Sequence, residues 1–263
     1  MLIGICGVGF VGGALKYSFN RLGIEHIEYD KYKNLGDFES LLQCNIIFLC
    51  LPTLLNHEND YDLTSLEETL CKLKKMQFSG LIVIKSTVVP GTTEKMGAKY
   101  NLDILHNPEF LTARTANDDF HNQTHIVIGK TTNCPQEKVD ECVKFYETYY
   151  KNARISLATS HESEAMKIFC NSFYCVKLGF FNEMFNYCNH FDIDYNRCRD
   201  LMLHNNWINK MHTQVPGPDG NLGYGGYCLP KDSTALLNSM KKNSTNSSIL
   251  EATILENKKI REK

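Results

Sequence analysis

Apolar residues in the first half of the chain gather in short runs, separated by longer stretches in which apolar residues recur at helical spacing. A short apolar run bounded by turn residues is consistent with a buried strand. Such runs occur at residues 2–6, 26–29, 45–51, 81–85, 102–105 and 125–128. Helical spacing marks residues 11–22, 63–76 and 92–99, and we expect a capping box from Thr64 to Glu67. Strands that alternate with helices predict an α/β fold with a doubly wound, mostly parallel sheet.

From about residue 159 the pattern becomes mainly helical. We expect helices at 160–190, 195–203, 231–241 and 248–261, with a loop rich in Gly, Pro and Asn at 205–230. The longest helix has an apolar face suited to packing against a second copy of the chain, formed by Ile168, Phe173, Val176, Phe180 and Met184. We therefore expect a Rossmann domain at residues 1–158, a helical domain at 159–263, and a homodimer through the long helix.

Composition and charge argue against several kinds of partner. The 263 residues carry a formal net charge of −2, so nucleic acid is not an expected partner. No apolar run approaches the ~18–20 residues that span a bilayer, and Met1–Cys6 lacks the charged start of a signal peptide. Eleven cysteines without a CxxC pair indicate reduced thiols and a cytoplasmic location. We interpret the histidines as surface or core residues and expect no metal.

A glycine fingerprint follows the first predicted strand. Gly7-Val8-Gly9-Phe10-Val11-Gly12 joins that strand to a helix, which is the context in which GxGxxG binds a dinucleotide. The first glycine makes the turn, the second lets the backbone approach the pyrophosphate, and the third lets helix and strand pack closely. Asp30 ends the second strand at the spacing of a ribose-binding acid, and its charge favours NAD over NADP. The sequence therefore predicts NAD as the cofactor.

Polar segments follow three of the other predicted strands. They are Leu51-Pro52-Thr53, the segment Lys85–Thr93 that contains Thr87, and the segment Asn107–Leu111 that contains Glu109. Ligands of open α/β sheets bind beyond the carboxyl ends of the strands, so these segments are expected to border the cofactor site.

The helical half carries two more groups of candidate residues. Lys167 and Asn171 lie four residues apart on the long helix and therefore point from one face. The glycine-rich stretch at 223–232 contains Cys228, followed four residues later by Asp232. A cysteine placed this way can act as a nucleophile on a substrate carbonyl.

Taken in order, these segments resemble the UDP-glucose/GDP-mannose dehydrogenase family. That family shows a PTP-type loop, a KSTVPPGTT-type segment, an NPEFL segment, a KxxxN helix and a GFGGxCxPKD loop. All five recur here, and the resemblance runs from the first strand almost to the last residue. It implies an NAD-dependent, four-electron oxidation of a nucleotide sugar at C6, with UDP-glucose giving UDP-glucuronate as the expected reaction.

The resemblance also implies a role for each matching residue. Cys228 would form a thiohemiacetal and then a thioester with the sugar carbon. Lys167 and Asn171 would stabilise oxyanions. Glu109 and Asp232 would be the candidates to orient or deprotonate the hydrolytic water, with Thr87 holding it and Glu109 as the expected general base. The implied cofactor contacts are Gly7, Gly9, Phe10, Val11, Gly12, Asp30, Pro52, Thr53, Thr87 and Lys231. The implied substrate contacts are Glu109, Phe110, Leu111, Lys167, Asn171, Tyr224, Gly225 and Cys228.

The chain departs from the family in regions of substrate recognition. Family members usually carry a third, nucleotide-gripping domain, and this sequence ends where that domain begins, so we expect a truncated or compact form. The DPRIG-type segment, whose arginine contacts the substrate phosphates, is replaced by residues 205–210, and Lys210 or Lys177 is a candidate substitute.

Three alternatives stay open at this point. The substrate can be another sugar nucleotide, such as a UDP-N-acetylhexosamine or GDP-mannose. The chain can be a catalytically silent remnant that binds NAD or a sugar nucleotide. A β-hydroxyacid-type dehydrogenase would share the two-domain plan and a helix lysine, but it would not need Cys228.

Overall fold

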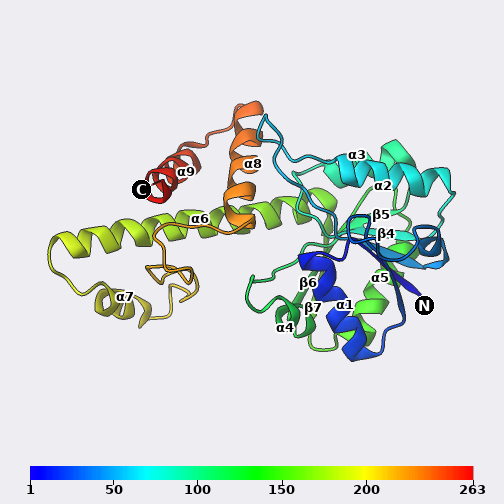
Figure 1. Ribbon diagram of the computed structural model, residues 1–263, viewed down its shortest axis with the longest axis horizontal. Coiled ribbons are helices and arrows are strands. Elements are labelled where there is room, and N and C mark those ends of the chain that lie inside the picture. The colour runs from blue at the N-terminus through cyan, green and yellow to red at the C-terminus, as the bar shows by residue number, and fades with distance from the viewer. Residues whose placement is uncertain (263) are drawn as a thin grey trace. The chain divides into compact units, whose positions relative to one another are not determined.

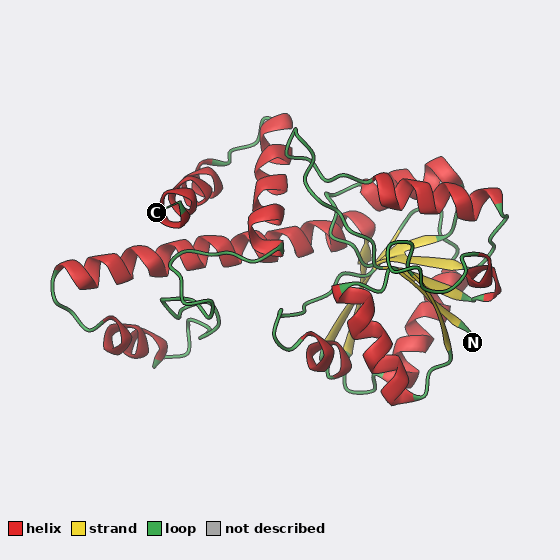
Figure 2. Cartoon of the chain, viewed as in Figure 1, coloured by secondary structure: helices red, strands yellow, loops and turns green. Residues whose placement is uncertain are grey.

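The computed structural model describes residues 1–262 and divides into two compact units. The first contains Met1–Leu54 and Tyr61–Lys167, and the second contains Leu55–Asp60 together with the chain from Ile168 onward. Figure 1 labels their helices and strands, and Figure 2 separates helix, strand and loop by colour. The domains predicted at residues 1–158 and 159–263 stay a proposal about which parts fold independently.

The first unit is built on a seven-stranded sheet in the order β2-β1-β3-β4-β5-β6-β7. Neighbouring strands are parallel except β5 and β6, where Leu105 lies opposite Lys130. The predicted doubly wound, mostly parallel α/β fold is confirmed. The strands are β1 (Ile3–Cys6), β2 (His26–Tyr29), β3 (Ile46–Leu49), β4 (Leu81–Ile84), β5 (Ile104–His106), β6 (His125–Lys130) and β7 (Arg154–Thr159).

Helices cover both faces of this sheet because alternate strand residues point to opposite sides. On one face, Ile3, Phe48 and Val83 pack with apolar residues of α1, α4 and α5. On the other face, Ile47 and Ile84 pack with η1, α2 and α3. The helices are α1 (Phe10–Leu22), the 3-10 helix η1 (Glu39–Gln43), α2 (Thr64–Lys75), α3 (Thr92–Tyr100), α4 (Ala116–His121) and α5 (Gln136–Tyr149).

The second unit is helical, as predicted. Helix α6 runs over Ser160–His190, with its first turns in the first unit, and is followed by α7 (Tyr195–Leu203), α8 (Cys228–Lys242) and α9 (Ser248–Arg261) (Figure 1). The bounds of α6, α7 and α9 match the prediction. Helix α8 begins three residues earlier than expected, because Pro230 fits the first turn of a helix, where its missing N–H has no intrahelical partner. Cys228 is therefore the first residue of a helix.

Two detailed expectations are wrong. The proposed capping box does not form, since no side chain caps α2 and the backbone N–H of Thr64 donates to Asp62 Oδ1 instead (2.9 Å). On α6, Ile168 is fully buried and is no part of an exposed apolar face. The exposed stripe beyond it is aromatic and consists of Phe169, Phe173, Phe180, Tyr187 and, just past the helix end, Phe191.

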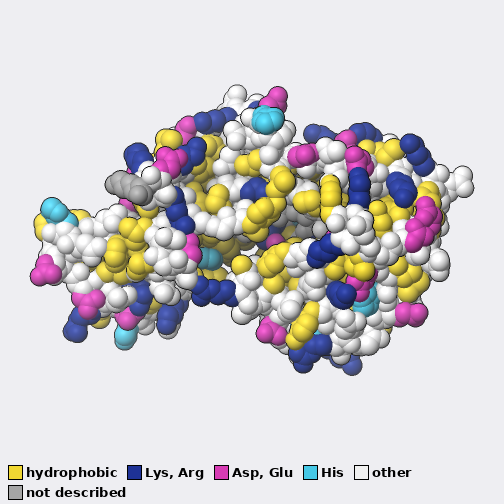
Figure 3. All heavy atoms as spheres, viewed as in Figure 1, with side chains coloured by type: hydrophobic (Ala, Val, Ile, Leu, Met, Phe, Trp, Pro, Cys, Tyr) yellow, Lys and Arg dark blue, Asp and Glu magenta, His cyan; other side chains and the backbone are white. Residues whose placement is uncertain are grey.

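The surface carries charges of both signs. On the face in Figure 3, Lys and Arg side chains are interspersed with Asp and Glu, in keeping with the net charge of −2. Among residues 1–262, no helix combines the length and apolar character required to cross a bilayer.

Candidate active site

The glycine turn after β1 has the geometry that a dinucleotide needs. Gly7 has φ of +90°, and a Cβ there would lie 2.5 Å from the carbonyl oxygen of Cys50. A Cβ at Gly12 would lie 1.9 Å from the carbonyl oxygen of Gly7, so both positions exclude larger residues. A Cβ at Gly9 would meet no protein atom within 4 Å. The space beside Gly9 and the N-terminus of α1, which no side chain caps, together fit a pyrophosphate.

Asp30 supports this turn from the end of β2. One carboxylate oxygen accepts the N–H of Val8 (2.8 Å), and the other accepts the N–H groups of Tyr32 and Lys33 (3.0 Å each). Lys33 Nζ donates to the carbonyl oxygen of Val8 (2.6 Å). A carboxylate has about four acceptor positions, so one position of Asp30 is left for a ribose hydroxyl. The residues present therefore fit the adenosine half of NAD.

Two candidate residues meet beyond β3 and β4. Thr53 Oγ1 donates to the carbonyl oxygen of Thr87 (2.9 Å), which ties the segment after β3 to the segment after β4. Ser86 strengthens the same junction by donating to the carbonyl oxygen of Leu51 (2.6 Å). Pro52 is exposed at this edge. The structure thus brings the predicted cofactor-side residues Pro52, Thr53 and Thr87 together.

Lys167 and Glu109 form a buried ion pair in the first unit. Lys167 Nζ lies 3.0 Å from Glu109 Oε1, and both side chains are less than a tenth exposed. The second carboxylate oxygen accepts the N–H of Leu111 (2.6 Å). The ring of Phe110 lies 5.7 Å from Lys167 Nζ, so the ammonium also has an aromatic neighbour. An acid and a cation held this way can accept a proton and stabilise a negative oxygen.

A buried polar network of Lys85, Asn107 and Tyr146, which was not predicted from the sequence, holds the backbone just before Glu109. Lys85 Nζ donates to the carbonyl oxygen and to Oδ1 of Asn107 (2.9 and 2.7 Å), and Tyr146 donates to the same Oδ1 (2.5 Å). Asn107 Nδ2 in turn donates to the carbonyl oxygen of Val127 (2.7 Å). Burial lowers the pKa of Lys85 to about 8. Since Asn107 lies two residues before Glu109, the network fixes the end of β5.

Glu164 is a second missed residue. Its carboxylate is fully buried and accepts the N–H groups of Gly91 (2.6 Å) and Thr93 (2.7 Å) at the start of α3. Burial raises the pKa of Glu164 above its ordinary value. Because Glu164 precedes Lys167 by one turn of α6, it fastens the segment after β4 to the helix that carries the lysine. The only feature of the sequence that pointed to Glu164 was its position three residues before Lys167 on the predicted long helix.

Cys228 occupies the first turn of α8 in the second unit and is exposed. The N-terminus of a helix carries a partial positive charge, which favours the thiolate form of a cysteine over the thiol. The buried cysteines differ, since burial raises the pKa of Cys142 and of Cys175 to about 12. Among these thiols, Cys228 has the surroundings of a reactive one.

Asp232 binds two other candidate residues of the second unit. Its carboxylate, which is almost fully buried, accepts from Asn171 Nδ2 (2.6 Å) and from Lys231 Nζ (2.6 Å). Asp232 lies one helical turn after Cys228 on α8. The structure therefore joins Asn171, Lys231 and Asp232 into one cluster at the start of that helix, while Lys167 and Glu109 belong to the first unit.

The two candidate substitutes for the phosphate-binding arginine are distant in the sequence, but the structure brings Lys177 to the segment that contains Lys210. Lys177 Nζ donates one of its three hydrogens to the carbonyl oxygen of Asn209, within the 205–210 segment. Lys210 is exposed. Neither observation selects one of them.

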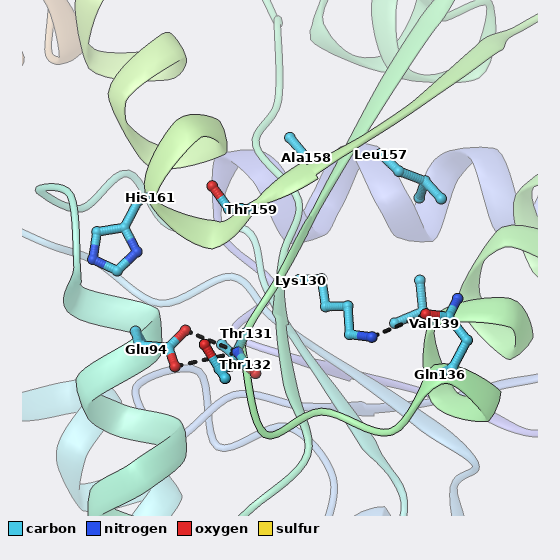
Figure 4. Close-up of a pocket in the computed structure, with 10 residues that line it drawn as sticks. All are labelled: Glu94, Lys130, Thr131, Thr132, Gln136, Val139, Leu157, Ala158, Thr159 and His161. Carbon is cyan, nitrogen blue, oxygen red and sulfur yellow. Dashed lines mark hydrogen bonds between the residues drawn. The ribbon is translucent and has the colours of Figure 1, made fainter.

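A separate hollow of the first unit is lined mainly by residues of β6, β7 and α5, with Glu94 of α3 and His161 of α6 (Figure 4). It has a volume of about 480 Å³ and lies beyond the carboxyl ends of β6 and β7, which run antiparallel to β5. Its charged side chains already have partners: Lys130 Nζ donates to Gln136 Oε1 (2.9 Å), and Glu94 accepts the N–H of Thr132 (3.0 Å). We assign no ligand to it.

Comparison with known proteins supports an NAD site in the first unit. Residues 25–150 match the model for the NAD binding domain of the UDP-glucose/GDP-mannose dehydrogenase family, and residues 161–259 match the model for its central domain. NAD is therefore the cofactor that this domain binds. When bound, it would be held by the turn at Gly7–Gly12 and by Asp30, on the geometry described above.

Individual relatives agree. The UDP-glucose 6-dehydrogenase of Haloferax volcanii is 29% identical to this chain, and the match covers 88% of this chain and 56% of the relative. The UDP-glucose 6-dehydrogenase of Rickettsia bellii is 30% identical, and the match covers 92% of this chain and 55% of the relative. The chain thus spans about half the length of these relatives. A UDP-glucose dehydrogenase structure from Pyrobaculum islandicum, 22% identical, superposes with a TM-score of 0.86 over 98% of this chain and 68% of that one. This chain belongs to the UDP-glucose/GDP-mannose dehydrogenase family.

Proposed function

We propose that the protein is an NAD-dependent nucleotide-sugar dehydrogenase that oxidises the C6 hydroxymethyl group of its substrate to a carboxylate. The observation that carries this proposal is the exposed Cys228 at the first turn of α8 in a chain that also has an NAD-binding unit. An alcohol can be oxidised to an aldehyde without a nucleophilic cysteine. Oxidation of an aldehyde is made easier by a covalent thiohemiacetal, which is what a reactive cysteine provides.

In this scheme the first unit supplies the cofactor site and the acid–base groups. NAD+, when bound, would supply the hydride acceptor for both oxidations. Glu109 acts as general base, first toward the C6 hydroxyl and later toward the hydrolytic water, with Thr87 holding that water. Lys167 stabilises the negative oxygen that develops on the sugar carbon. The buried Lys167–Glu109 pair supports these roles, because each side chain holds the other in a fixed orientation.

The second unit supplies the covalent chemistry. The Cys228 thiolate adds to the aldehyde carbon, and the former carbonyl oxygen takes a proton, which gives a thiohemiacetal. The second oxidation converts the thiohemiacetal to a thioester. Attack by water then releases the carboxylate and the thiolate. Among the residues that the structure describes, Asn171 gives one amide hydrogen to Asp232, and the other is left for an oxyanion, which supports its assignment.

UDP-glucose is the proposed substrate because the relatives that match most of the chain are named UDP-glucose 6-dehydrogenases. The test is to incubate the protein with NAD+ and a panel containing UDP-glucose, a UDP-N-acetylhexosamine and GDP-mannose. We expect the highest kcat/KM with UDP-glucose and a product that has gained one oxygen and lost two hydrogens by mass. Preference for another sugar would reassign the substrate, and an aldehyde as final product would remove the thioester step.

We also propose a homodimer through α6. Its exposed aromatic stripe includes Phe173, which is 61% exposed, and Phe180, with Tyr187 a further two turns along. Aromatic side chains at this spacing form one face of a helix, and an apolar face of this kind is suited to burial against a partner. Cytoplasmic location remains an expectation from the thiol content.

A further inference from the structure

The segment that leads into Cys228 is rich in glycine, and side chains from other helices bind its backbone. Residues 223–227 read Gly-Tyr-Gly-Gly-Tyr, and Gly223 and Gly226 both have positive φ. Glycine backbones lose more conformational freedom on ordering than any other residue. A segment of this composition needs external contacts to present the next residue in one direction. We call residues 223–227 the nucleophile loop.

Helix α9 supplies contacts to this loop through Asn257. The side-chain amide of Asn257 pairs with both backbone groups of Tyr224: Oδ1 accepts its N–H (2.7 Å), and Nδ2 donates to its carbonyl oxygen (3.0 Å). The N–H of the preceding Gly223 donates to Asn182 Oδ1 on α6 (2.7 Å). Tyr224 itself is 3% exposed, so its ring and its backbone are both held.

Arg261, one turn further along α9, holds the glycines on either side of Tyr224. Its Nη1 donates to Asp219 Oδ2 (2.9 Å), and its Nη2 donates to the carbonyl oxygen of Gly223 (3.4 Å). A Cβ at Gly225 would lie 2.8 Å from Nη1, so the guanidinium lies directly against the backbone there. All of these residues belong to the second unit.

We propose that Asn257 and Arg261 are positioning residues: they clamp the nucleophile loop and so set the direction in which Cys228 presents its thiolate. This inference rests on the proposed function for its meaning in catalysis, because it assumes that Cys228 is the nucleophile. Neither side chain is assigned a contact with substrate or NAD. Their effect is expected in the rate of the covalent step and in the reactivity of the thiol, with no effect on cofactor binding.

The first test measures the clamp without using enzyme activity. Asn257→Leu removes both bonds to Tyr224 at similar volume, and Lys258→Met changes an exposed neighbour on α9 as the matched control. We expect amide hydrogen exchange at Tyr224 to accelerate about tenfold or more in Asn257→Leu, and to stay unchanged in Lys258→Met. The rate constant for alkylation of Cys228 by iodoacetamide, followed by peptide mass, should change about threefold or more in the same variant.

The second test separates positioning from simple stability. For Asn257→Leu and Arg261→Met we expect kcat per folded molecule to fall about tenfold while KM for NAD+ stays unchanged. Arg261→Lys, which keeps one cationic donor, should recover part of the lost kcat. Should Asn257→Leu fail to fold, Asn257→Asp keeps the acceptor for Tyr224 N–H and serves in its place.

Each outcome decides the inference. Faster exchange at Tyr224 with an unchanged Cys228 alkylation rate and unchanged kcat would show that the clamp is only structural, and it would overturn the proposal. A chain that oxidises no sugar nucleotide would remove the proposed function. The exchange and alkylation results would then still decide whether α9 controls the thiol.

Discussion

Lys167 Nζ lies 3.0 Å from Glu109 Oε1, and both groups are withdrawn from solvent. Breaking such a pair leaves one uncompensated buried charge, which costs about 3–5 kcal/mol. We therefore predict that Lys167→Met lowers the free energy of unfolding by about this amount. Adding Glu109→Leu should restore much of the loss, since the remaining charge is removed.

Urea unfolding of the two single variants and the double variant measures this coupling. Both single variants and the double variant should lack dehydrogenase activity, because the proposed base and oxyanion-stabilising groups are absent. Stability losses that simply add in the double variant would contradict a direct interaction between the two side chains.

The glycines of the turn after β1 separate cofactor binding from folding. A Cβ at Gly9 would have no protein atom within 4 Å, so the Gly9→Ala variant should fold normally. Its methyl group would occupy the space expected for the pyrophosphate, so NAD affinity should fall about tenfold. Gly13→Ala is the matched control, because its Cβ also meets no atom within 4 Å but lies one turn inside α1. It should keep NAD affinity and gain about 1 kcal/mol of stability.

Calorimetric titration with NAD and thermal unfolding of both variants provide the readouts. Equal NAD affinity in the Gly9→Ala and wild-type proteins would place the pyrophosphate elsewhere.

Lys85 predicts a pH dependence of stability. Burial lowers its pKa from the ordinary 10.5 to about 8. Between these two values the unfolded chain binds more protons than the folded one, so the contribution of Lys85 to stability rises with pH across this window. The full difference is about 3 kcal/mol. Below about pH 8 the contribution is constant, because the lysine is protonated in both states.

The measurement is the difference in unfolding free energy between wild type and Lys85→Met at about pH 7.5 and about pH 9.5. Taking the difference removes the opposite trend of the buried cysteines, whose pKa values are raised. The wild-type advantage should grow over this interval. A flat or falling difference would show that Lys85 keeps its proton in the fold.

The exposed stripe of α6 makes a prediction about assembly. Phe173→Glu places a charge in the proposed dimer face and should shift the sedimentation coefficient from dimer to monomer. Asn189→Glu is the control, because residue 189 is exposed on the same helix and lies roughly opposite residue 173 at about 100° per residue. A wild-type protein that sediments as a monomer at micromolar concentration would contradict the dimer.

Long, regular elements of this fold were predictable from the sequence. Helix α6 was predicted with its observed bounds because apolar residues recur at helical spacing for many turns with no proline. The glycine turn was predictable because GxGxxG follows a strand and opens a helix. Helices α4 and α5 and strand β7 were missed, since polar residues dilute their short apolar patterns.

The connections within the site depend on tertiary structure and were less accessible. Asn171 and Lys231 were expected to face substrate and cofactor, and the fold pairs both with Asp232. Glu164 and Lys85 lie within segments already singled out, but nothing in their spacing reveals partners at Gly91 and Asn107. Burial creates these bonds, because a buried polar group must find a partner and the nearest one comes from a distant segment.

The most direct test of the central claim counts NADH formed per molecule of UDP-glucose consumed, with wild type beside Cys228→Ala. We expect two NADH per sugar in wild type and no carboxylate product from the variant, with NAD affinity unchanged. Full double oxidation by Cys228→Ala would contradict the cysteine mechanism. A folded wild-type protein that binds NAD but forms no NADH from any sugar nucleotide would contradict the enzymatic activity proposed for this chain.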